Sequence, residues 1–218
     1  LNTIVAEPFS DACDVLEKAE DFDLAVHDLI KEYMTEHQRI IFNGNGYARE
    51  WEEEAARRGL PNIPSMVAAV DTLTTPKAIH LFEKFGIFTK AELISREEII
   101  YETYAKTLNI EALTMINMAN KKIIPAVIRY SKSLADTVIA VKDAGADASV
   151  QRDILNTVSS KLITAKNALL RLEEATAQAG TIKSAKDKAF FYKDTVKVEM
   201  DALRKPVDEL ELVVDKSM

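Results

Sequence analysis

Long stretches without glycine most constrain the fold of this chain. Its six glycines, at positions 44, 46, 59, 86, 145 and 180, fall where the helical spacing of apolar residues stops, and none is expected inside a helix. Glycine readily adopts the left-handed backbone that commonly ends a helix. The segments between Gly86 and Gly145, and between Gly145 and Gly180, can therefore form helices well beyond the usual three turns.

Apolar side chains recur alternately three and four residues apart along the second half of the chain, which places them in narrow seams along helices. Gly145 and Gly180 leave only short connections, so neighbouring helices are expected to run antiparallel and to cross at about +20°. The three seams comprise Leu155, Val158, Leu162, Ala165, Leu169, Leu172, Thr176 and Ala179; Ile116, Ala119, Ile123, Val127, Tyr130, Leu134, Val138 and Val141; and Tyr192, Val196, Met200, Leu203, Val207, Leu210 and Val214.

The first ninety residues predict shorter, interrupted helices. A short exposed helix is expected over residues 49–58. It is supported by two pairs spaced four residues apart, Glu53 with Arg57 and Glu54 with Arg58, and is ended by Gly59. Two prolines then separate it from another short helix over 65–72. Helix starts are predicted at Thr75 before Pro76 and at one of two capping boxes, Thr89 with Glu92 or Ser95 with Glu98.

The predicted fold is therefore all-α, with short broken helices over residues 1–90 and a bundle or hairpin of long antiparallel helices over 91–218. Pro125 and Pro206 lie inside otherwise continuous apolar patterns. Each removes a backbone donor, at a cost of about 3 kcal/mol in an isolated helix. We expect kinks rather than breaks, and either proline in an extended loop of more than three residues would contradict this.

Charge and composition exclude several classes of partner. The 35 acidic residues exceed the 28 basic ones, giving a net charge of −7, and the best basic pair, Lys121–Lys122, is too small a patch to bind nucleic acid. A single cysteine cannot form an intrachain disulfide, which favours a reducing cytoplasm. Neither an apolar run of about 18 residues nor a basic-then-apolar leader is present, so neither a membrane nor secretion is expected.

No metal or catalytic site can be assembled from the residues. His27, His37 and His80 are the only histidines, and no Glu-x-x-His pair supplies the ligands of a carboxylate-bundle metal site. Cys13 has no histidine close in sequence and is interpreted as a buried packing residue. The acidic run Glu52–Glu54 is interpreted as a solvated face.

The stretch Asn43-Gly44-Asn45-Gly46 invites comparison with a phosphate-binding loop. It lacks both a preceding strand and the lysine that such loops carry. Glycine and asparagine tolerate positive φ, so a helix end followed by a turn is the favoured interpretation. We therefore assign no catalytic, cofactor-binding or metal-binding residue to this segment.

A family resemblance rests on the region around that turn. Tyr33 to Tyr47, reading Tyr-Met-Thr-Glu-His-Gln-Arg-Ile-Ile-Phe-Asn-Gly-Asn-Gly-Tyr, is followed by Glu50-Trp51 and by Arg57-Arg58-Gly59-Leu60. Together these resemble the C-terminal region of type III glutamine synthetases. The resemblance extends to residues 2–7, 82–88 and 202–210, and so covers the whole chain.

The resemblance implies a parent enzyme that ligates glutamate and ammonia with ATP, assisted by Mg²⁺ or Mn²⁺. In that family the catalytic and metal-binding residues lie upstream of Leu1, so none is assigned here. The isolated segment is expected to be inactive. Because its helical pattern starts at the first residue and the family continues beyond Met218, we expect a piece cut from a longer protein.

Two roles remain open for the segment. In the favoured one, residues 1–90 complete the outer layer of the catalytic domain and the long helices pack between subunits of a homo-oligomer. In the alternative, an exposed heptad seam makes the segment a helical regulatory or partner-binding module. An independent enzyme is the least favoured, because no acid, base and nucleophile set is present.

Overall fold

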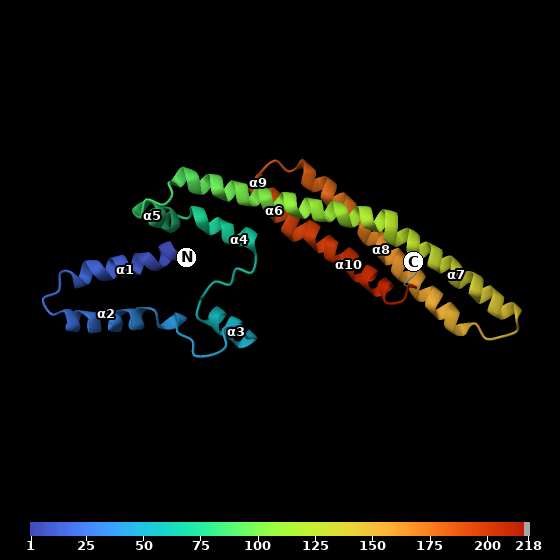
Figure 1. Ribbon diagram of the computed structural model, residues 1–218, viewed down its shortest axis with the longest axis horizontal. Coiled ribbons are helices and arrows are strands. Elements are labelled where there is room, and N and C mark those ends of the chain that lie inside the picture. Colours follow the sequence, from blue (N-terminus) through green and yellow to red (C-terminus); the bar gives the residue numbers. More distant parts are fainter. Residues whose placement is uncertain (216–218) are drawn as a thin grey trace. The chain divides into compact units, whose positions relative to one another are not determined.

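The computed structural model describes residues 1–215, and its regular elements within that range are all helices (Figure 1). The predicted all-α class, with short helices followed by long antiparallel ones, is confirmed. The chain divides into two compact units, Leu1–Glu97 and Glu98–Met218, which are described separately. The predicted boundary at residue 90 falls at the start of a helix, Lys90–Met118. This helix continues across the division between Glu97 and Glu98.

The first unit contains short helices joined by irregular segments. The α1 helix packs against α2 and α5. The elements are α1 (Asn2–Leu16), α2 (Phe22–Glu36), the 3₁₀ turn η1 (Gln38–Ile40), α3 (Arg49–Arg57), α4 (Met66–Val70), the 3₁₀ turn η2 (Asp71–Thr74), α5 (Pro76–Lys84) and the beginning of α6 (Lys90–Met118).

Side-chain caps set several of these helix starts. The Thr75 side chain accepts a hydrogen bond from the Ala78 amide, and Pro76 occupies the first helical position. Of the two candidate capping boxes, the one with Thr89 forms: its amide donates to Glu92 Oε2 at 2.8 Å, and the Glu92 amide donates back to Thr89 Oγ1 at 3.3 Å. Ser95 instead lies within α6.

The second unit is a bundle in which α8 packs against both α7 and α10 (Figure 1). The α7–α8 connection contains Gly145, whose φ of 78° requires the left-handed region. The elements after α6 are the π-helical turn η3 (Ala119–Ile123), α7 (Ile124–Asp143), α8 (Ser149–Thr181), α9 (Ala185–Phe191), the π-helical turn η4 (Tyr192–Val196) and α10 (Lys197–Glu211).

The three predicted seams form the core of this bundle. Every residue of the three seams is buried or partly buried. The most deeply buried large side chains of the bundle are Val158, Leu169, Leu172, Val196, Leu203 and Leu210. Burying such a side chain stabilises the fold by about 1.5–3 kcal/mol, so packing outweighs the ion pairs at the bundle surface.

Neither proline breaks its helix. Pro206 lies inside α10 and is buried, and Pro125 lies in the first turn of α7. The turn η3 precedes Pro125, and there the Ile124 amide donates to the Ala119 carbonyl in the wider π pattern. This widening accommodates the missing donor, so the chain stays helical from Lys90 to Asp143. A third proline, Pro8, lies inside α1.

Two predictions about individual residues were wrong. Gly180 lies inside α8, and the positive φ expected of helix-ending glycines occurs at Gly59, Gly86 and Gly145. The α8 helix ends at Thr181, one residue after Gly180. Cys13 is exposed rather than buried, because α1 has no buried residue in this chain.

Candidate functional site

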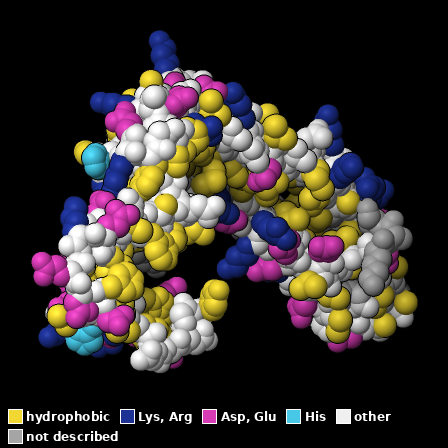
Figure 2. All heavy atoms as spheres, turned by 60° about the vertical axis from the view of Figure 1, so that its left-hand side comes forward, with side chains coloured by type: hydrophobic (Ala, Val, Ile, Leu, Met, Phe, Trp, Pro, Cys, Tyr) yellow, Lys and Arg dark blue, Asp and Glu magenta, His cyan; other side chains and the backbone are white. Residues whose placement is uncertain are grey.

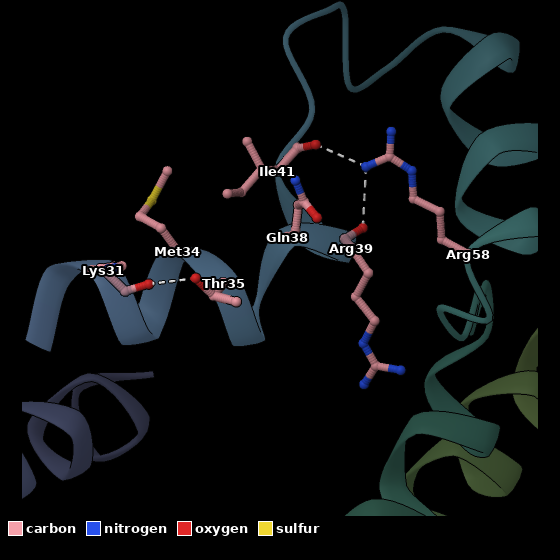
Figure 3. A pocket seen from close by; sticks show the side chains of 7 residues that line it. All are labelled: Lys31, Met34, Thr35, Gln38, Arg39, Ile41 and Arg58. Atoms are coloured by element: carbon pink, nitrogen blue, oxygen red, sulfur yellow. Dashed lines mark hydrogen bonds between the residues drawn. The ribbon is translucent and has the colours of Figure 1, made fainter. Parts of the chain in front are cut away.

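An open hollow in the first unit lies where α2 gives way to an irregular segment. Its volume is ≈ 890 Å³, and it is open to solvent. Figure 3 shows its lining, in which the Arg58 guanidinium points toward the backbone of the segment that follows α2. The lining residues are Lys31, Met34, Thr35, Gln38, Arg39, Ile41 and Arg58.

Arg58 ties this segment to α3. Its Nη1 donates to the carbonyl oxygens of Ile41 at 2.7 Å and Arg39 at 3.2 Å, while Nε donates to Glu54 Oε1. The hydrogen bond from Arg58 is the main reason why the pKa of Glu54 is lowered, and the charges of Arg57 and Arg58 add to it. The predicted Glu54–Arg58 pair is thus confirmed. The predicted Glu53–Arg57 pair was wrong, because Glu53 pairs with Arg49 and Arg57 pairs with Glu54.

Aromatic packing adds to the same junction. The Phe42 and Trp51 rings stack with centroids 4.4 Å apart, and the Arg58 guanidinium lies 5.8 Å from the centre of the Trp51 ring. Phe42 also lies so close to Gly44 that a Cβ there would come within 2.5 Å of the ring. Gly44 is therefore needed for close approach rather than for a left-handed turn.

The interpretation of Asn43–Gly46 as a helix end was wrong. The α2 helix already ends at Glu36, with His37 as its C-cap, and η1 ends at Ile40. Arg58 holds the two carbonyls on either side of that end, and the Asn45 side chain accepts from the Tyr47 amide at 3.0 Å. The run is a loop that follows the segment held by Arg58. The Glu54–Arg58 spacing showed that Arg58 has a partner on α3, but not that it also reaches this segment.

The hollow has cations but no catalytic set. Arg58 already donates to Glu54 and to two carbonyls, and Met34 and Ile41 add exposed apolar surface. Among residues 1–215, no group of three or more His, Cys, Asp or Glu side chains could hold a metal ion. His27 contacts the neighbouring Asp28, and the His37 ring lies 6.1 Å from that of Tyr33. These residues do not fit an ATP–metal centre, so none is assigned to one.

The more extensive feature of this unit is uncovered apolar surface on α1 and α2. Neither helix has a buried residue, although both carry large apolar side chains. Figure 2 shows such apolar side chains open to solvent. Those on α1 and α2 that are exposed are Ile4, Val5, Phe9, Val15, Phe22, Leu24, Ile30 and Met34. Where exposed apolar side chains form a contiguous patch, they typically mark an interface.

None of the helices within residues 1–215 combines the length and apolar character needed to cross a membrane.

Comparison with known proteins identifies related chains. Residues 25–142 match the family model described as the glutamine synthetase C-terminal domain. The chain is 37% identical over 191 residues to a glutamine synthetase of Butyrivibrio fibrisolvens, with 87% of this chain and 27% of that protein aligned. It is 32% identical over 230 residues to a type-3 glutamine synthetase of Dictyostelium discoideum, covering 100% of this chain and 31% of the relative. A glutamine synthetase of Bacteroides fragilis is 27% identical over 207 residues, with 92% and 28% covered.

Proposed function

The chain belongs to the glutamine synthetase family, of which it carries the C-terminal domain, and we propose that it serves as a non-catalytic part of an ATP-dependent glutamate–ammonia ligase. The chain spans less than a third of the length of the relatives it matches. The parent would form glutamine from glutamate, ammonia and ATP in the cytoplasm. Mg²⁺ or Mn²⁺ would be held by residues outside this segment, since the described residues offer no such cluster.

The observation that carries the proposed role is the uncovered apolar surface of α1 and α2. A helix normally buries its apolar stripe against another element, and each large side chain so buried contributes about 1.5–3 kcal/mol. Here that surface faces solvent. We therefore propose that residues 1–90 complete the outer layer of the parent's catalytic domain, which would cover these helices.

The long helices have a different proposed role. Their seams are already buried within the bundle, so residues 91–218 do not need the catalytic domain to supply a core. We propose that they project from it and pack between subunits of a homo-oligomer. Exposed apolar side chains on the bundle, including Ile110, Leu113, Ile128 and Ile139, support a contact of this kind.

The first experiment compares Phe9→Ser in the full-length parent and in the 218-residue chain. Phe9 is 69% exposed in the chain, so the substitution should cost less than about 1 kcal/mol there and about 2–3 kcal/mol where the catalytic domain covers the side chain. Denaturant unfolding measures both. Equal effects in the two proteins would show that α1 remains uncovered in the parent.

The second experiment removes residues 91–218 from the full-length enzyme and measures its mass by light scattering. A smaller oligomer is expected, and an unchanged one would rule out the assembly role.

The isolated chain should form no glutamine from glutamate, ammonia and ATP once contaminating enzyme is excluded. Measurable turnover by this chain would contradict the non-catalytic assignment.

The regulatory alternative has less support. It requires an exposed heptad seam that receives a helix from another protein. The three seams found in the sequence pack against each other within the bundle. Purification of the parent with and without residues 91–218 tests the alternative. The alternative predicts that another protein co-purifies with the parent only when these residues are present.

A further inference from the structure

A second hollow lies wholly within the second unit. It opens between α6, the end of α8 and the α9–η4 segment, and its volume is ≈ 330 Å³, within the range of small-molecule sites. We call it the lysine hollow. It is lined by Glu102, Ala105, Lys106, Asn109, Ala179, Gly180, Lys183, Ala185, Lys188 and Tyr192.

A buried tyrosine fixes one polar group of the lysine hollow. Tyr192 begins the π-helical turn η4 and is only 3% exposed, and its hydroxyl donates to Asn109 Oδ1 at 2.8 Å. Burial raises the pKa of Tyr192, so the hydroxyl stays protonated and acts as a donor at neutral pH. This hydrogen bond orients the Asn109 amide, whose Nδ2 group carries two donors that can serve a ligand.

The charge of the lining is positive in an acidic chain. Glu102 is its one carboxylate, and Lys106 Nζ lies 2.6 Å from Glu102 Oε2. The hydrogen bond from Lys106 is the main cause of the lowered pKa of Glu102, and the charge of Lys188 contributes. No ion pair joins Lys183 or Lys188 to another described residue of the second unit, which leaves two ammonium groups for a bound anion.

Small residues open the space between these polar groups. Ala105, Ala179, Gly180 and Ala185 line the hollow, and a Cβ on Gly180 would meet nothing within 4 Å. Ala179 and Ala105 are buried beneath the hollow, so its accessible small residues are Gly180 and Ala185, and lysine and asparagine donors would face the charged ends of a ligand. Ammonium and amide donors suit oxygen acceptors that carry negative charge.

We propose that the lysine hollow binds a small oxyanion ligand, a metabolite carrying carboxylate or phosphate groups. Lys183 and Lys188 supply the charge, and Asn109, oriented by Tyr192, supplies directional hydrogen bonds. A ligand held by α6, α8 and α9 together would stabilise the bundle through its preference for the folded state. The site is independent of the proposed role in assembly.

The test uses calorimetric titration of the 218-residue chain with inorganic phosphate and, separately, glutarate. Saturable binding of at least one probe is expected. Lys183→Met with Lys188→Met should weaken it about tenfold or more, since charge-assisted hydrogen bonds are lost. Lys166→Met, at an exposed position on α8, is the matched control and should bind as the unmodified chain does.

Binding by glutarate alone or phosphate alone would assign the carboxylate or phosphate source. Failure of both probes to bind at millimolar concentration, or equal affinity in the double variant and the Lys166→Met control, would overturn the proposal. If the double variant loses its helical circular dichroism, the site is tested instead by the NMR signals of the Asn109 side-chain amide in the unmodified chain. These signals should shift as the probe is titrated in. Signals that stay unchanged at saturating probe would reject the site.

Discussion

The two units bury their apolar side chains to very different degrees. In the first, the buried apolar side chains are Ala55, Val67, Val70, Leu81 and Leu93, and α1 and α2 contribute none. In the second, a continuous core runs through α7, α8, η4 and α10. Both have amphipathic helices, so amphipathicity alone does not show that a helix finds its partner within the same segment. The bundle thus supplies its own core, whereas α1 and α2 leave large apolar side chains exposed in this chain.

The largest expected effect tests the self-sufficiency of the bundle. Leu172 is 0% exposed, whereas Leu170 on the same helix is 49% exposed. Leu172→Ala should lower the free energy of unfolding by about 3–5 kcal/mol through lost burial and a cavity. Leu170→Ala, the matched control, should cost less than about 1 kcal/mol. Urea unfolding followed by circular dichroism measures both, and similar losses would mean that α8 is not packed as described.

Glycine substitutions give the next largest contrast. Gly145 has a φ of 78°, so Gly145→Ala should destabilise the chain by about 1–2 kcal/mol. Gly180 is helical with open space around its Cβ position, so Gly180→Ala should be neutral or stabilising by up to about 1 kcal/mol. The midpoint temperature of thermal unfolding should fall for Gly145→Ala, and for Gly180→Ala it should rise or stay unchanged. A loss of stability in Gly180→Ala would contradict the helical end of α8.

Helix caps allow the two units to be probed separately. Ser184 caps α9, and its side chain accepts from the Asp187 amide at 3.2 Å, while Thr75 caps α5. Ser184→Ala should destabilise the bundle by about 1 kcal/mol. Thr75→Ala should raise hydrogen exchange within α5 and leave exchange in α8 unchanged. Equal changes in α8 from both variants would show that the units unfold as one.

The smallest effect concerns pH. Glu209 pairs with Lys161, and the hydrogen bond from Lys161 is the main cause of its lowered pKa. A carboxylate with a depressed folded-state pKa adds stability above its ordinary value of 4.5, and this is lost as the pH falls through the folded-state pKa. The stability advantage of the unmodified chain over Glu209→Gln should therefore be present at pH 7 and vanish in acid. Both pair members are partly exposed, so the difference should also shrink at high salt.

The bundle was predictable from sequence because its helices bury each other's apolar seams. Spacing of three and four residues identified seam residues such as Val158, Leu203 and Leu210, and the structure buries them. The prolines could be predicted to leave their helices unbroken, but the π turn before Pro125 could not. It depends on how the backbone relaxes around the missing donor rather than on a residue pattern.

The candidate site was less predictable, because its contacts join residues distant in sequence. The loop at Asn43–Gly46 was visible as a special stretch, yet its conformation depends on Phe42, Trp51 and Arg58 meeting in space. Cys13 was misjudged for a related reason. An apolar helical face predicts burial only where something covers it, and no residue of α1 is fully buried in this chain. The lysine hollow likewise gathers residues from α6, α8 and α9 that no local pattern connects.

The close approach of Phe42 to Gly44 has a consequence for sequence divergence. A side chain at Gly44 would displace the ring from its stack on Trp51, whereas one at Gly46 would meet nothing within 4 Å. The two glycines look equivalent in the sequence, but only the first is sterically required. As related chains drift apart, the second glycine should be replaced freely while the first is retained together with its two aromatic partners. Recognising distant members of the family should therefore depend on the spacing of Phe42, Gly44 and Trp51 rather than on the doublet of glycines.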